Sequence, residues 1–196
     1  MTRKKVAKKR PSKERKKKGE GKLATRVSRS QLKAVSKPRA GAVRMDARLK
    51  GLTVAVEPPI DANPADLLPV FLAKLDASLT TLRNAGTPFK LVEGFRTVER
   101  QQWLFGSGRP NAQPFGRPGP ILTNADGVTK RSKHQGTGAP GSGVAADCYP
   151  TRNGNVYIPP SSDPIWNAYA AAVVAQGLVA GHNWPTFKDS PHCEEP

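Results

Sequence analysis

The chain has 196 residues, with 32 Lys and Arg against 15 Asp and Glu, so its formal net charge is +17. This length suits a single domain, and the two cysteines are too few for a disulfide framework. The longest apolar run, residues 169–175, is much shorter than the roughly 20 residues of a membrane-spanning helix.

The basic charge is concentrated at the N-terminal end. Residues 1–50 hold 20 Lys and Arg and 3 Asp and Glu, whereas residues 51–196 hold 12 of each kind. Residues 1–45 contain no aromatic residue and few large apolar ones, so we predict a disordered Lys/Arg-rich tail followed by a folded domain over residues 46–196. Such a tail either only keeps the protein soluble or binds a polyanion: an anionic cell-surface polymer, an anionic membrane or, less favoured, nucleic acid.

The folded part opens with a helical pattern. Asn63 followed by Pro64 predicts a helix start, and leucines at helical spacing continue to Leu82 before Asn84-Ala85-Gly86 ends the helix. Residues 89–95 are typical of a strand, and a second helix is expected over residues 98–105.

The second half continues with a Gly/Pro/Asn-rich stretch, residues 106–131, which predicts a long loop. Residues 143–149 are typical of a buried strand, Asn153-Gly154 of a turn, and residues 163–174 of a helix that Gly177 ends. Together the elements predict an α+β fold with two main helices packed against a small antiparallel sheet.

Two short stretches concentrate side chains suited to metal chemistry. The sequence has only three histidines, and two of them, His134 and His192, accompany the carboxylates Asp147 and Asp189. Two neutral imidazoles and one carboxylate are a zinc-ligand set that leaves a position open for water. The remaining carboxylate, Asp189, precedes His192 by three residues and could take a proton from such a water. The alternative is a pair of hydrogen-bonded structural imidazoles.

The sequence around these residues resembles the zinc peptidase family of L-alanyl-D-glutamate endopeptidases, common in phage endolysins, and D-Ala-D-Ala carboxypeptidases. Four motifs occur in the family's order over about residues 65–195. They are Phe95-Arg96-Thr97 followed by Gln101, then Ser132-x-His134, then Gly143-x-Ala145-x-Asp147, and finally Trp184-x-x-Phe187-x-Asp189-x-Pro191-His192.

The resemblance implies a fold like that of the D-Ala-D-Ala carboxypeptidases, with a zinc cleft. It implies His134, Asp147 and His192 as zinc ligands and Asp189 as general base. Glu194 is the competing carboxylate, because it lies two residues from His192 and would share the face of that ligand on a strand. Arg96 would hold a substrate carboxylate or the oxyanion. Ser132 would orient the substrate or the neighbouring ligand, and Gln101 is carried over as a substrate-binding residue.

The chain departs from the family at two points. Thirteen positions separate His134 from Asp147, about six more than usual, and the excess falls in the Gly/Pro/Ser-rich residues 136–142, where an added loop is tolerated. His182 stands where the family often has Gly, and we do not expect it to be a ligand. Cys148 and Cys193 each follow a ligand, so on strands they would point to the opposite face as buried core residues; a disulfide is the minority alternative.

The resemblance implies a monomeric peptidase that cleaves the stem peptide of peptidoglycan, first between L-Ala and D-Glu and as second choice at D-Ala-D-Ala. An alternative of another class is a non-catalytic protein with a structural metal site, whose tail binds a cell surface or nucleic acid. The N-terminus lacks the apolar core of a secretory signal. We therefore expect synthesis in the cytoplasm and action at the bacterial cell wall after release, as a free endolysin or as part of a virion.

Overall fold

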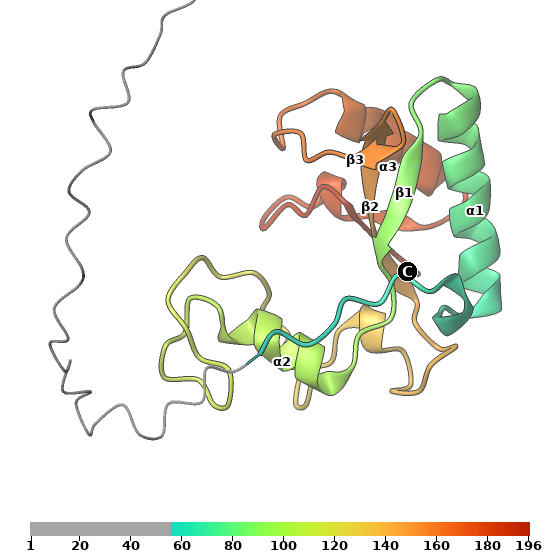
Figure 1. Cartoon of the computed structure of the whole chain (residues 1–196). Coiled ribbons are helices and arrows are strands. Elements are labelled where there is room, and N and C mark those ends of the chain that lie inside the picture. The colour runs from blue at the N-terminus through green and yellow to red at the C-terminus, as the bar shows by residue number, and fades with distance from the viewer. Residues whose placement is uncertain (1–55) are drawn as a thin grey trace, which may run out of the picture. The chain divides into compact units, whose positions relative to one another are not determined.

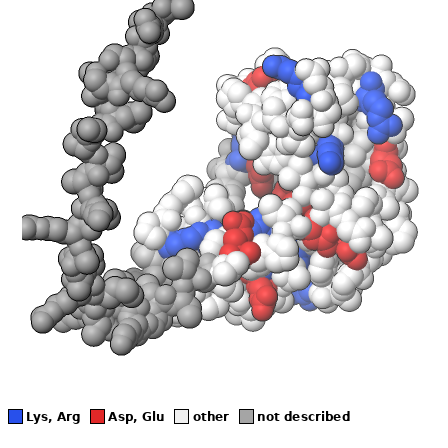
Figure 2. Space-filling model, viewed as in Figure 1, with Lys and Arg blue, Asp and Glu red and all other residues white. Residues whose placement is uncertain are grey.

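The structure is a computed structural model that describes residues 56–196. The predicted tail, residues 1–45, and the predicted domain start at residue 46 lie outside the described residues. In the described part no helix combines the length and apolar character needed to cross a membrane. This part holds 12 basic and 12 acidic residues. Basic and acidic side chains are interspersed on the face seen in Figure 2.

The predicted α+β fold is confirmed (Figure 1). Five antiparallel strands form one sheet in the order β1-β2-β5-β4, with β3 paired to β2. The helices are α1 (Pro69–Asn84), α2 (Val98–Gly106) and α3 (Ile165–Ala175). The strands are β1 (Phe89–Glu93), β2 (Ala145–Arg152), β3 (Asn155–Val156), β4 (Val179–Ala180) and β5 (His192–Glu194).

The first long helix begins later than the sequence pattern predicts. Asn63 does cap a helical turn, accepting a hydrogen bond from the Ala65 backbone N–H at 3.2 Å, but this turn is a short 3-10 helix that ends at Asp66. Leu68 then adopts an extended backbone (φ −60°, ψ 129°), and α1 starts at Pro69. The extended conformation is the one favoured before proline, so Pro69 rather than Pro64 sets the start of the helix.

The hydrophobic core lies between the sheet and two helices, α1 and α3. Phe71, Leu75 and Leu82 of α1 and Trp166, Tyr169 and Val173 of α3 are buried in one cluster with Phe89 and Leu91 of β1. Phe89 stacks on Tyr169 with ring centroids 4.9 Å apart. Cys148 of β2 and Cys193 of β5 belong to this cluster as free, buried thiols, which confirms their predicted place in the core.

Side-chain alternation places the chemically active residues on the other face of the sheet. Cys148 and Cys193 point into the core, so their neighbours Asp147 and His192 point away from it. Asp147 and His192 are directly paired across β2 and β5. On β1 the register shifts between Leu91, paired with Cys148, and Glu93, paired with Asp147. This bulge turns Glu93 from the core face to the face that carries Asp147.

Candidate metal centre

His134 is delivered by a single 3-10 turn, Lys133–Gln135. Ser132 and Gln135 form a capping box around this turn, an arrangement that satisfies otherwise unpaired N–H groups. The turn is attached to the end of β1, because the Arg96 backbone N–H donates to the His134 carbonyl at 3.1 Å. The His134 ring is fully buried, and its Nδ1 lies 2.6 Å from the Gly94 carbonyl oxygen. A carbonyl accepts only from a protonated nitrogen, so Nε2 is the free acceptor.

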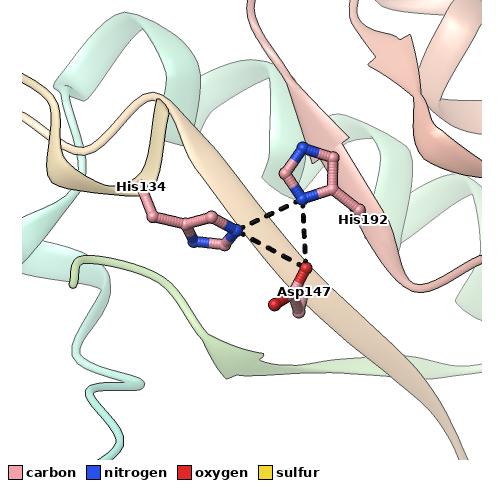
Figure 3. Close-up of side chains that lie close together, drawn as sticks. All are labelled: His134, Asp147 and His192. Atoms are coloured by element: carbon pink, nitrogen blue, oxygen red, sulfur yellow. Dashed lines mark hydrogen bonds and ion pairs between the residues drawn. The ribbon is translucent and has the colours of Figure 1, made fainter. Parts of the chain in front are cut away.

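His134, Asp147 and His192 converge on one point although they lie far apart in the sequence (Figure 3). His134 Nε2 lies 3.2 Å from His192 Nδ1 and 3.6 Å from Asp147 Oδ1, and His192 Nδ1 lies 3.2 Å from Asp147 Oδ1. All three residues are buried, and their three ligand-type atoms lie within 4.8 Å of one another. The cluster has the spacing and chemistry to hold a metal ion.

Each of the three side chains also makes a hydrogen bond on the side that faces away from the shared point, and this bond sets its orientation. His192 Nε2 lies 3.0 Å from Glu194 Oε2, which leaves Nδ1 for the shared point. The second oxygen of Asp147 accepts from Arg96 Nη2. Metal-binding histidines commonly donate their other N–H to a carbonyl or a carboxylate, which sets the tautomer and the ring orientation. The donor set therefore fits a divalent metal, and zinc suits two imidazoles and one carboxylate.

The protonation of the cluster follows from burial and from charge. Burial, with help from the charge of Arg96, lowers the pKa of His134. Burial also acts to lower the pKa of His192, but hydrogen bonds to Asp147 and Glu194 outweigh it and raise the pKa to about 9. Burial would raise the pKa of Asp147, but the imidazoles and Arg96 hold it well below its usual range. Without metal, one imidazolium and one carboxylate thus balance each other at neutral pH.

Asp189 lies beside the cluster in the cleft and is not one of the three clustered groups. Its backbone N–H donates to the Gly181 carbonyl at 3.2 Å, and its carbonyl accepts from the His192 N–H at 3.2 Å. Glycine at position 181 permits this approach, because a Cβ there would lie 2.5 Å from the Asp189 carbonyl oxygen. Burial and the negative charge of Asp147 raise the pKa of Asp189 to about 6, near the value suited to a general base at neutral pH.

The cleft has a volume of about 400 Å³ and contains His134 and His192 in its wall. Trp184 and Phe187 of the C-terminal segment contribute apolar surface, and the Trp184 ring centroid lies 5.1 Å from that of His192. The predicted long loop, residues 106–131, begins at the last residue of α2 and beyond it contains no helix and no strand of the sheet. Its residues 122–125 and 130–131 form another part of the wall.

Arg96 lines the cleft, but its guanidinium is engaged on its inner side. Nη2 donates to Asp147 and, at 2.7 Å, to Glu93 Oε2, while Nη1 lies 3.5 Å from Gln101 Oε1. A direct contact of Arg96 with substrate or oxyanion stays a prediction, because this arrangement shows it orienting Asp147 instead. Gln101 is fully buried and donates to the Ala125 carbonyl at 2.9 Å, so its position supports the cleft wall and not the predicted substrate contact.

The remaining predicted residues take supporting positions. Ser132 lines the cleft and caps the turn of His134; its role in orienting the substrate or the neighbouring ligand stays a prediction. Glu194 holds His192, which favours a supporting role over that of general base. His182 bonds to Ser190 and Asn167 at 3.0 and 3.1 Å, so it lies outside the cluster, as expected.

Sequence reasoning missed a chain of buried charges behind the cluster. One oxygen of the Glu93 carboxylate accepts a hydrogen bond from Arg96 Nη2. The other accepts one from Arg100 Nε at 2.7 Å. Arg100 Nη1 in turn donates to Glu57. Asp147, Arg96, Glu93, Arg100 and Glu57 thus alternate in sign from the metal centre to the surface. The three-residue spacing of Arg96 from Glu93 does not predict this chain of ion pairs, because Glu93 faces the site only through the bulge in β1.

No protein-family model matches the chain. The fold is similar to two solved structures. One is the L-Ala D-Glu endopeptidase ChiX of Serratia marcescens, with 23% sequence identity, a TM-score of 0.46, and coverage of 68% of this chain and 84% of that one. The other is the LD-carboxypeptidase LdcB, with 14% identity, a TM-score of 0.41, and coverage of 71% and 66%. Because both TM-scores lie below 0.5, we base the function on the residues of the site.

Proposed function

We propose that the protein is a zinc-dependent peptidase that hydrolyses the stem peptide of peptidoglycan. The observation that carries this proposal is the three-ligand cluster at the wall of an open cleft, with a further carboxylate, Asp189, in the same cleft. The choice of peptidoglycan comes from the four sequence motifs that resemble the zinc peptidase family. Within that substrate class, the bond between L-Ala and D-Glu is our first choice and D-Ala-D-Ala the second.

The chain's own residues divide the work of hydrolysis. A zinc ion held by His134, Asp147 and His192 would supply a Lewis acid that lowers the pKa of water to about 7. Asp189 takes a proton from the water that attacks the peptide carbonyl, and passes it to the leaving amine as the C–N bond breaks. Arg96, Glu93 and Glu194 hold the ligands in place, while Trp184 and Phe187 flank the peptide.

The second candidate is a non-catalytic protein in which the metal only stabilises the fold. Structural zinc sites usually close with a fourth Cys or His. Within residues 56–196 the remaining candidates are engaged elsewhere, since His182 bonds to Ser190 and Asn167 and both cysteines lie in the core. The cluster instead borders a cleft, and this favours the enzyme.

Purified protein incubated with intact muropeptides, with and without chelator, tests the proposal. We expect new amino groups only in the metal-loaded sample. Mass spectrometry of the products identifies the bond: free D-Glu amino termini indicate the endopeptidase, and released D-Ala indicates the carboxypeptidase. Chelator-insensitive hydrolysis would contradict zinc dependence, and an absence of hydrolysis with stoichiometric zinc would favour the structural site.

The basic N-terminal segment gives the proposal a second part. Its excess of 17 positive charges over residues 1–50 supports attachment to an anionic cell-surface polymer or membrane near the substrate. Action at the cell wall after release from the cytoplasm belongs to the same proposal.

A further inference from the structure

Charges of both signs line the cleft. Asp189 and Glu194 come from the C-terminal segment, and the basic residues Lys130, Arg131 and Lys133 come from the stretch that leads into His134. Fixed charges in a cleft act on the charged groups of a bound peptide.

The cation that the sequence predicts for a substrate carboxylate is already engaged. Arg96 contacts both Asp147 and Glu93, so its charge is balanced within the protein. Lys133 is engaged as well, because its ammonium group donates to the backbone carbonyls of Glu195 and Pro196 at 2.8 and 3.0 Å. An incoming anion must therefore find its partner elsewhere in the cleft.

Lys130 and Arg131 are the cations left for that purpose. Among residues 56–196, neither has a carboxylate within ion-pair distance. The ammonium of Lys133 uses two of its three donors, whereas the Arg131 guanidinium uses two of its five, donating to the carbonyls of Thr137 and Gln135 at 3.2 and 3.4 Å. The nearby acid, Asp126, is used by the loop itself: its side chain accepts from the Lys130 and Val128 N–H groups, each at 2.8 Å.

The backbone that carries these two cations is firmly attached. Gly127 N–H donates to the Lys130 carbonyl at 3.0 Å, and the Gln135 side chain donates to the Gly127 carbonyl at 2.9 Å. The contacts of Arg131 with the carbonyls of Gln135 and Thr137 also place its guanidinium against residues 136–142, the stretch that is longer than usual. The backbone of both residues and the guanidinium of Arg131 are thus held in place before substrate binds, which reduces the entropic cost of recognition.

We propose that Lys130 and Arg131 form an anion subsite for a free carboxylate of the stem peptide beside the scissile bond. This inference rests on the proposed function. A D-Glu residue that continues the stem peptide through its side-chain carboxyl keeps its α-carboxylate free, and amidation removes that charge without changing the shape. The protein therefore cleaves stem peptides with a free carboxylate in preference to their amidated forms.

The test compares two soluble stem peptides that differ only by carboxylate or amide at D-Glu. The wild type is expected to prefer the carboxylate form by about tenfold in kcat/KM. Lys130→Gln/Arg131→Gln should lose this preference, and the loss should appear as a higher KM for the carboxylate form. The control, Arg83→Gln/Lys90→Gln, removes the same charge from exposed positions outside the cleft wall. It should keep the preference for the carboxylate form. The charge-preserving variant Lys130→Arg/Arg131→Lys should keep most of it.

Each contrary result has a distinct meaning. Equal kcat/KM of the wild type on both peptides, or a preference that survives in the double glutamine variant, overturns the subsite. The subsite is also overturned if the charge-preserving variant loses the preference for the carboxylate form as completely as the glutamine variant does. The shape of the loop, and not its charge, would then determine the preference. If the zinc-loaded wild type cleaves neither peptide, the proposed function itself fails.

Discussion

Two carboxylates approach the metal centre from the C-terminal segment, and their surroundings give them different roles. Asp189 has a pKa raised to about 6 by burial and by Asp147, whereas Glu194 bonds to His192 Nε2 at 3.0 Å. Asp189→Ala should retain zinc and lose turnover by on the order of 10²-fold or more. Glu194→Gln should instead lower zinc affinity by on the order of tenfold. Zinc content and single-turnover rates measure both effects; an active Asp189→Ala protein beside an inactive Glu194→Gln protein would reverse the assignment.

The same Asp189 carboxyl sets the acid limb of the activity. Because its pKa is about 6, the Asp189 carboxylate becomes protonated as the pH falls through that value and can then no longer accept a proton. A bound divalent cation acts in the opposite direction to burial and lowers the pKa from that value, so kcat is expected to decline at pH 6 or below and to stay level above it. A pH series of kcat checks this, and a rate that rises on acidification would contradict a general base.

His192 links metal binding to proton release. Its pKa of about 9 in the metal-free protein leaves it protonated at pH 7, while the pKa of His134 is lowered. A metal requires both imidazoles to be neutral, so zinc binding at pH 7 should release about one proton. Zinc affinity should accordingly rise as the pH approaches 9. Isothermal titration in buffers of different ionisation enthalpy measures the proton, and a buffer-independent heat would contradict this prediction.

At the scale of the elements, β1 connects the metal centre to a buried ion network. The bulge between Leu91 and Glu93 turns Glu93 toward Arg96 and Arg100. Glu93→Gln leaves two buried guanidinium groups less well paired, so the free energy of unfolding of the metal-free protein should fall by about 3 kcal/mol. The matched control is Glu99→Gln at an exposed position of α2, which should change little. Denaturant unfolding compares the two, and equal stabilities would contradict a structural role for Glu93.

The limits of sequence reasoning also appear at this scale. The alternating burial of β1 and the helical spacing of α3 are periods that side-chain burial imposes directly, so the sequence predicts both elements. The short apolar run of β2 predicts a buried strand without alternation. The predicted start of α1 is wrong, because Asn63 caps only a 3-10 turn and the helix begins at Pro69 without a side-chain cap. His134, Asp147 and His192 were found through their motifs. Glu93 and Arg100 were missed because a bulge is not visible in an alternating pattern.

At the scale of the whole molecule, we expect binding to anionic surfaces and hydrolysis of the peptide to depend on different parts of the chain. Residues 1–50 carry the net +17, and residues 51–196 are neutral overall. Deleting residues 1–45 should leave hydrolysis of small soluble stem peptides nearly unchanged while binding to anionic cell surfaces falls. Binding of the full chain should weaken as salt rises, since charges are screened over about 8 Å at physiological ionic strength. Equal, salt-insensitive binding by both forms would show that the segment acts only as a solubiliser.

The central claim is that His134, Asp147 and His192 hold one zinc ion that hydrolysis requires. The most direct measurement is a zinc titration of the metal-free full-length protein, with bound metal and stem-peptide hydrolysis followed in the same samples. We predict that activity rises linearly and stops at one zinc per chain, and that His192→Ala gains neither tight metal binding nor activity. Full metal occupancy in His192→Ala, or full turnover by the metal-free wild type, would contradict the claim.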